Sequence, residues 1–157
     1  MKFLVTKELA HVALLKNLMV TVCVALFFYL GLDVVVHGYV LGFDVDGILS
    51  SLYGNAEEYI EPILIDSLLL QVHIDLFMSL FSLLILSSIY IRLFAELKSS
   101  KYLVHVVLFL GLLSPLLLML AYFTSEVWVF VWLFSFILGH LLAMYMSLTI
   151  VKKLLIK

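Results

Sequence analysis

Long apolar runs separated by short polar clusters dominate the pattern of this chain. Four runs stand out, at about residues 14–37, 64–92, 102–123 and 127–151. Each has at least about the 20 residues that a helix needs to cross a hydrocarbon core about 30 Å thick. The pattern therefore predicts an all-α membrane protein, in which four transmembrane helices with up-down topology form a single bundle and a single domain over residues 1–157.

The connections between the runs predict how neighbouring helices are joined. Only residues 124–126 separate the third run from the fourth, so these two helices are expected to form an antiparallel hairpin. The segment 38–61 carries four of the seven glycines and is predicted to be an outer loop. Within it, residues 48–53 are expected to form a short interfacial helix, with Leu49 and Leu52 dipping into the membrane.

Composition supports the membrane class and excludes several functions. The 157 residues are 66% hydrophobic and 13% charged, whereas about a quarter of the residues in a soluble domain are charged. Nine basic residues against eleven acidic ones give no positive surplus for binding nucleic acid. Cys23 is the single cysteine, which excludes a disulfide framework within one chain.

The charges are strongly segregated along the chain, and this predicts orientation. Basic residues occur near the two termini and in the second connection, at Lys2, Lys7, Lys16, Arg92, Lys98, Lys101, Lys152, Lys153 and Lys157. The first and third connections and their borders are acidic, with Asp44, Asp46, Glu57, Glu58, Glu61, Asp66 and Glu126. Because positive loops stay in the cytoplasm, both termini are predicted to be cytoplasmic, in a multi-pass protein of the inner (plasma) membrane.

A few ionisable residues within or beside the spans are the candidate functional residues. A charged side chain in a span costs at least ~2.5 kcal/mol, so it is a functional hypothesis by default. Counted from the outer ends of the first and second spans, Asp33 and Asp75 lie at nearly equal depth, as do His37 and His73. If these two helices are neighbours, the four side chains form one cluster near the outer surface.

Three interpretations of this cluster remain open. In the first, Asp33, His37, His73 and Asp75 bind a divalent metal ion. In the second, His37 and His73 are the axial ligands of a b-type haem. In the third, the cluster is a hydrogen-bond network that fixes helix packing. His73 lies about 160° around its helix from Asp75, which argues against both ligand interpretations because these two residues cannot face the same partner.

The fourth run carries a second candidate pair, His140 and Met144, one helical turn apart. An imidazole beside a thioether can bind a copper ion or haem iron. The alternative is a buried histidine, hydrogen-bonded across the bundle, next to a packing methionine. His105 lies about two turns from the depth of His140, which disfavours a second bis-histidine site.

For the function of the whole protein, three classes are considered. Hydrolytic and nucleotide-binding motifs are absent from the sequence, so the first expectation is a non-catalytic subunit or assembly factor of a larger membrane complex, for example a respiratory one. Its partners would be the lipid bilayer and other membrane subunits or a second copy of the chain. The second class is a redox protein that binds haem b or a metal. The third is a small cation or proton transporter with a path from Asp33 and Asp75 through Ser79 and Ser82 to His140.

Overall fold

A computed structural model describes residues 13–156, and this part of the chain contains five helices. Four are long: α2 (Ala13–Leu41), α4 (Ile65–Leu93), α5 (Lys98–Phe123) and α6 (Val127–Leu155). The fifth, α3 (Val45–Tyr53), is short. Lys2, Lys7 and Lys157, which contribute to the predicted orientation, lie outside the described residues.

All four long helices are long and apolar enough to cross a membrane. With 26 or 29 residues each, they measure about 39–44 Å at 1.5 Å per residue. This exceeds the ~30 Å hydrocarbon core, so the ends of helices that crossed it would reach into the headgroup regions. The prediction of a helical bundle with four candidate membrane spans is confirmed. The helices run further than the apolar runs at some ends, for example to Leu41 in α2 and Leu155 in α6.

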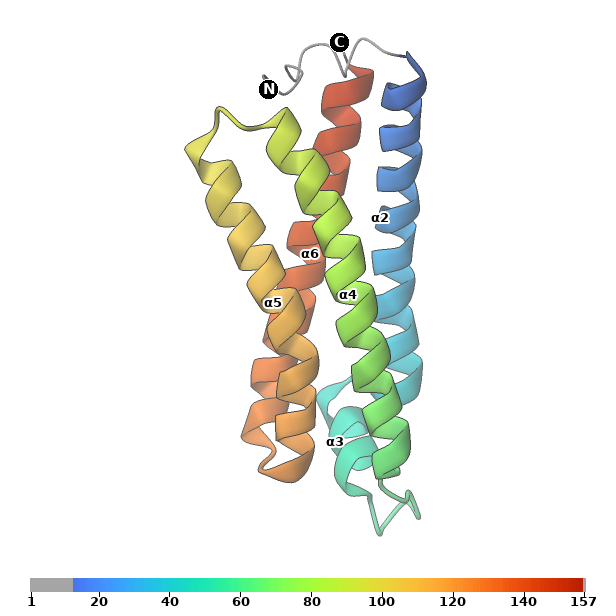
Figure 1. Cartoon of the computed structure of the whole chain (residues 1–157). Helices are drawn as coiled ribbons and strands as arrows, with labels where there is room; N and C mark the ends of the chain where they lie inside the picture. Colours follow the sequence, from blue (N-terminus) through green and yellow to red (C-terminus); the bar gives the residue numbers. More distant parts are fainter. Residues whose placement is uncertain (1–12, 157) are drawn as a thin grey trace.

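The long helices alternate in direction along the bundle (Figure 1). The start of α2 and the end of α6 lie at one end, which we call the terminal end, and α3 lies at the other, the loop end. α6 packs against α5 and α2 and also contacts α4, while α5 packs between α4 and α6. α2 packs mainly against α6 and meets α4 over a much smaller area. The first two spans are therefore only partial neighbours.

A tight turn joins α2 to α3. Gly42 has a φ of 124°, a left-handed conformation that only glycine adopts without strain. A Cβ atom added to Gly42 would lie 2.7 Å from the carbonyl carbon of Gly47, so the close approach of the two backbones also requires glycine. Asp44 is the N-cap of α3, and its carboxylate accepts a hydrogen bond from the Gly47 N–H at 2.9 Å.

The apolar face of α3 packs on the bundle. Ile48 and Leu52 are 2% and 1% exposed and contact apolar residues of the long helices. Leu49 is partly buried against the same cluster, and the Tyr53 hydroxyl donates to the Ala121 carbonyl at 2.6 Å. Leu52, which was expected to dip into the membrane, therefore packs against the loop end of the bundle instead, whereas Leu49 is only partly covered there.

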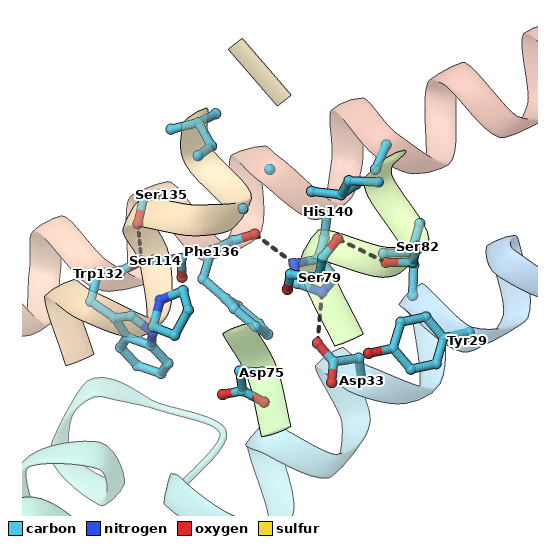
Figure 2. Close-up of a pocket in the computed structure, with 17 residues that line it drawn as sticks. Tyr29, Asp33, Asp75, Ser79, Ser82, Ser114, Trp132, Ser135, Phe136 and His140 are labelled. Carbon is cyan, nitrogen blue, oxygen red and sulfur yellow. Dashed lines mark hydrogen bonds and ion pairs between the residues drawn. The ribbon is translucent and has the colours of Figure 1, made fainter. Parts of the chain in front are cut away.

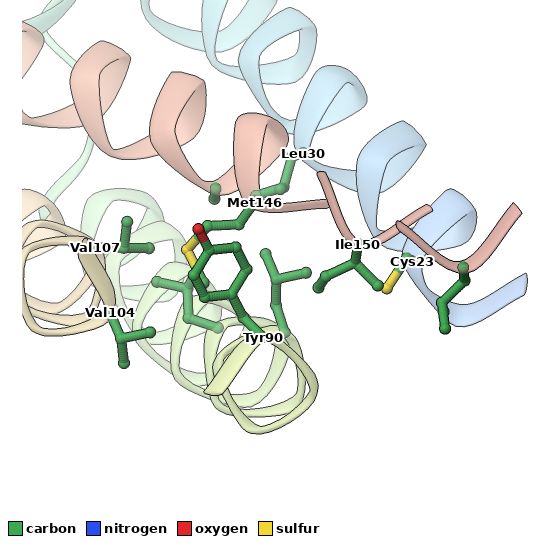
Figure 3. Close-up of a cluster of buried hydrophobic side chains, with 11 residues drawn as sticks. Cys23, Leu30, Tyr90, Val104, Val107, Met146 and Ile150 are labelled. Atoms are coloured by element: carbon green, nitrogen blue, oxygen red, sulfur yellow. The ribbon is translucent and has the colours of Figure 1, made fainter. Parts of the chain in front are cut away.

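Two apolar clusters fill the interior. The terminal cluster, part of which is labelled in Figure 3, consists of Cys23, Leu30, Leu83, Leu86, Tyr90, Val104, Val107, Ala143, Met146, Ile150 and Leu154. The loop cluster consists of Leu41, Ile48, Leu52, Leu68, Val72, Leu117, Leu118, Ala121, Val129, Trp132 and Phe136. Between the two clusters along the helices lie four of the ionisable side chains considered from the sequence, and we call this region the polar layer: Asp33, His37, Asp75 and His140.

Candidate functional site

His37 is the most enclosed residue of the polar layer. Its side chain is 4% exposed, and its ring packs against the ring of Phe136 at a centroid distance of 4.5 Å. The Nδ1 atom lies 2.9 Å from the backbone carbonyl oxygen of Asp33, one turn earlier in α2. The Nε2 atom lies 3.0 Å from Oδ2 of Asp75 in α4. His37 therefore joins α2 to α4 at the point where these helices meet.

Asp75 is held from two sides. Its side chain is 10% exposed, and its Oδ1 atom accepts a hydrogen bond from the Gln71 amide at 2.9 Å. The same amide nitrogen lies 3.4 Å from Nε2 of His37. Gln71 was not among the candidate residues that the sequence analysis named. Its place four residues before Asp75, on the same helix face, was the available signal.

His140 brings α6 into the layer. Its Nδ1 atom lies 2.8 Å from the Phe136 carbonyl oxygen, and its Nε2 atom lies 2.8 Å from Oδ2 of Asp33 (Figure 2). The other oxygen of Asp33, Oδ1, is 3.7 Å from Nδ1 of His37. The Asp33 carboxylate therefore lies between the two histidines, and the layer connects α2, α4 and α6.

Both histidines have the same hydrogen-bond arrangement. A carbonyl oxygen can only accept, so Nδ1 of His37 and Nδ1 of His140 must each carry a hydrogen. A neutral imidazole then has its lone pair on Nε2, and in both residues this atom faces a carboxylate oxygen, which is also an acceptor. Two acceptor atoms 2.8–3.0 Å apart repel each other unless a proton lies between them or one metal ion binds both.

The layer also has the geometry of a metal site. One potential ligand atom from each of Asp33, His37 and Asp75 lies within 4.8 Å of the other two. Metal-bound histidines commonly donate their second ring N–H to a backbone carbonyl, as His37 does. Imidazole nitrogen together with carboxylate oxygen suits divalent ions such as Zn²⁺, Fe²⁺ or Mn²⁺, whereas Cu(I) and iron–sulfur clusters select thiolate or thioether sulfur.

A small cavity of about 20 Å³ adjoins the layer, enough for about one water molecule. Asp33, Asp75 and His140 line it, together with serines from three helices (Figure 2). Ser114 is 5% exposed, and its hydroxyl has no hydrogen-bond partner. Pro115 has no N–H, so the Gly111 carbonyl one turn earlier lacks its helical donor. The cavity therefore contains buried polar groups that a water molecule would satisfy.

Three of the histidines and methionines considered from the sequence lie elsewhere. His73 is exposed and lies on the other side of α4 from Asp75, so it does not meet His37. Met144 packs against the terminal cluster. His105 is exposed, and its Nδ1 atom bonds the carbonyl of Lys101. The structure thus does not bring together the His37 and His73 pair of the haem interpretation, and the cavity is far smaller than a macrocycle.

The predicted transport path is only partly formed. Ser79 and Ser82 line the cavity, but His140 reaches Asp33 directly rather than through them. Towards the terminal end the helices pack through the terminal cluster. Within residues 13–156, that half of the bundle contains no buried carboxylate or imidazole. The ionisable groups are therefore confined to one layer in this conformation.

Comparisons with known proteins found no matching family model, no matching curated protein and no matching solved structure.

Proposed function

We propose that this chain is a non-catalytic membrane protein that binds one divalent transition-metal ion in the polar layer. Asp33, His37 and Asp75 are the proposed ligands. His140 is the proposed positioning residue, since it bonds the second oxygen of the Asp33 carboxylate. The observation that carries the proposal is the convergence of three potential ligand groups within 4.8 Å, between two apolar clusters.

The charge balance of the layer supports this proposal. Asp33 and Asp75 are only 17% and 10% exposed, and burying two carboxylates without compensation costs several kcal/mol. A single divalent cation balances both negative charges and turns the Nε2 lone pair of His37 into a ligand. Nδ1 of His37 carries a hydrogen, so its Nε2 atom and Oδ2 of Asp75 are two acceptors that face each other. The metal ion would bind both of these atoms.

We further propose that the protein spans the inner (plasma) membrane with both termini in the cytoplasm and α3 outside. The charge distribution supports this orientation. Arg92, Lys98, Lys101, Lys152 and Lys153 belong to the terminal end, and the acidic residues of segment 38–61 belong to the loop end. Single cysteines at Ala56 and Ser99 test it, because Cys23 is fully buried and gives little background. A membrane-impermeant maleimide should label Ala56→Cys in intact cells and Ser99→Cys only after permeabilisation; the opposite result would reverse the orientation.

We propose that, in the cell, the chain with its metal site belongs to a larger membrane assembly, formed with other subunits or with a second copy of the chain. Outside the four long helices, the described residues comprise only α3 and short connections, which leaves little extramembrane mass for a catalytic domain. Stoichiometric co-purification from native membranes in mild detergent would identify the partners. If other membrane assemblies stay intact in the same detergent while this protein elutes alone as a monomer, the proposed assembly is contradicted.

The decisive experiment measures metal content. Purified protein, incubated separately with Zn²⁺, Mn²⁺ or Fe²⁺ and desalted, is expected to retain about one ion per chain of at least one of these metals. Asp33→Asn, His37→Gln and Asp75→Asn should reduce the content to background. His73→Gln and His105→Gln are matched controls, since both histidines are exposed and lie outside the layer. Folding of each variant is checked by circular dichroism and size-exclusion chromatography.

Two results would contradict the metal proposal. One is a wild-type protein that retains none of the three metals. The other is equal retention by the ligand variants and the controls, which would place the bound ion elsewhere. A visible spectrum of the same sample tests the haem alternative, and we expect no Soret band.

A further inference from the structure

A groove between α2 and α4 opens on the side of the bundle near the terminal end. Its volume is about 490 Å³, within the range of ligand-binding clefts. Its walls are Leu15 and Met19 from α2, and Phe81, Leu84, Ile85, Ser88, Ile89, Arg92 and Leu93 from α4. None of these residues belongs to the polar layer, so an inference about the groove does not depend on the metal site.

The groove exists because α2 and α4 diverge. The two helices meet near the polar layer, where His37 bonds Asp75, and they separate towards the terminal end (Figure 1). The wall residues are large and mostly apolar, and several are well exposed, including Phe81 at 58% and Leu84 at 48%. Transmembrane helices that pack closely do so through small residues such as glycine, alanine and serine. Apart from Ser88, this wall lacks them, so it suits a flexible apolar chain better than a helix.

Among the described residues that line the groove, Arg92 is the only cation, and it lies at the end of the groove. Arg92 is in the last turn of α4 and is exposed, and within residues 13–156 no carboxylate forms an ion pair with it. The nearby Lys153, in contrast, is engaged: its ammonium donates to the Leu93 carbonyl and lies 4.2 Å from the centre of the Phe94 ring. An apolar groove that ends at an available guanidinium matches a molecule with an apolar tail and an anionic head.

We propose that the α2–α4 groove binds one anionic phospholipid. An acyl chain lies along the apolar wall, and the phosphate of the headgroup binds the Arg92 guanidinium. Arg92 is suited to this contact because it lies at the end of a helix that is longer than the hydrocarbon core, at headgroup level. Planar guanidinium groups bind phosphate oxygens in pairs, which adds to the charge attraction.

The test uses the full-length protein after removal of bound lipid. Native mass spectrometry measures binding of phosphatidylglycerol and of phosphatidylcholine with identical acyl chains. We expect one tightly bound phosphatidylglycerol per chain and weaker binding of phosphatidylcholine. Arg92→Gln should reduce the preference for the anionic lipid about fivefold, because one basic residue at an anionic surface contributes about 1 kcal/mol. Lys98→Gln removes the same charge outside the groove and should keep the preference.

A second variant tests the acyl site separately from the headgroup site. Ser88 is an exposed residue of the wall, so Ser88→Trp should fill the groove without disturbing the buried core and should abolish retention of both lipids. Equal binding of the two lipids by the wild type would overturn the proposal. So would an unchanged preference in Arg92→Gln or unchanged retention in Ser88→Trp. A dimer that Ser88→Trp dissociates would assign the groove to a second copy of the chain and would also overturn it.

Discussion

Replacing Gln71 by leucine tests whether the polar layer is built around a metal ligand or only around a packing contact. The Gln71 amide donates to Oδ1 of Asp75 at 2.9 Å, while Oδ2 of the same carboxylate faces His37. Leucine has a similar volume and a good helix propensity, so the change removes the amide's hydrogen bond to Asp75 and its contact with Nε2 of His37, and little else. The Asp75 carboxylate then loses the group that fixes its orientation.

The expected magnitudes differ between the two roles. Removing a hydrogen-bond partner of a metal ligand lowers metal affinity about 10–100-fold, which corresponds to about 1.4–2.8 kcal/mol. The contribution of the same bond to folding should be smaller. It links two positions one turn apart in α4, and side-chain hydrogen bonds within membrane proteins average about 0.6 kcal/mol. Gln71→Leu should therefore weaken metal binding more than it lowers the free energy of unfolding.

The assay combines two measurements on the same detergent preparation. Competition with a fluorescent chelator gives the Zn²⁺ affinity, and unfolding in SDS gives the stability. His73→Leu is the matched control, because His73 is also a polar residue of α4 but is exposed on the other side of the helix. An unchanged Zn²⁺ affinity in Gln71→Leu, or an equal loss in His73→Leu, would refute the assigned role of Asp75 as a ligand.

Other predictions concern the scaffold. Gly42→Ala should lower the unfolding free energy in SDS by more than about 1 kcal/mol because φ is 124° and α3 backbone atoms are close, whereas Gly31→Ala, with nothing within 4 Å, should raise it by up to about 1 kcal/mol. Ser147→Ala should lower the unfolding free energy by about 0.6 kcal/mol in the same assay, since the Ser147 hydroxyl donates to the Cys23 carbonyl of α2 at a distance of 2.7 Å. Partial burial and then the charge of Glu126 raise the pKa of Tyr53. The hydrogen bond of Tyr53 should therefore persist above its usual pKa and disappear as pH rises through the raised value, which the stability difference between wild type and Tyr53→Phe would show.

The helices could be predicted well from hydropathy, with some ends four residues short, and the early end predicted for α2 has a physical reason. The sequence Val36-His37-Gly38 resembles the end of a span, because glycine often ends a helix. In the structure Gly38 lies inside α2, and the helix ends at Leu41 before Gly42, the glycine that has the positive φ. Sequence alone does not distinguish a glycine that a helix tolerates from one that a turn requires.

The candidate site was predicted in part. Counting residues from the outer ends of the first and second spans predicted that Asp33, His37 and Asp75 lie near one another, and the structure brings them together. The bond between Asp33 and His140 was missed because, counted from the predicted helix ends, these residues lie four and thirteen residues deep, which is about 13 Å apart at 1.5 Å per residue. α2 runs four residues further than predicted, and it stops short of the α5–α6 turn, where α3 fills the space (Figure 1). Tertiary packing therefore shifted α2 relative to α6, and single-sequence counting has no access to that shift.

The two apolar clusters have an electrical consequence. In the proposed membrane-spanning arrangement, a charge held in the polar layer would lie inside the membrane's field, where crossing the whole potential is worth about 2.3 kcal/mol per 100 mV. On the side of the terminal end, the terminal cluster separates the layer from water, and taking a bare ion through such a medium costs several kcal/mol. The field thus cannot drive a charge from the layer through this barrier in the described conformation. The bundle can keep ionisable groups within the voltage drop and still act as an insulator.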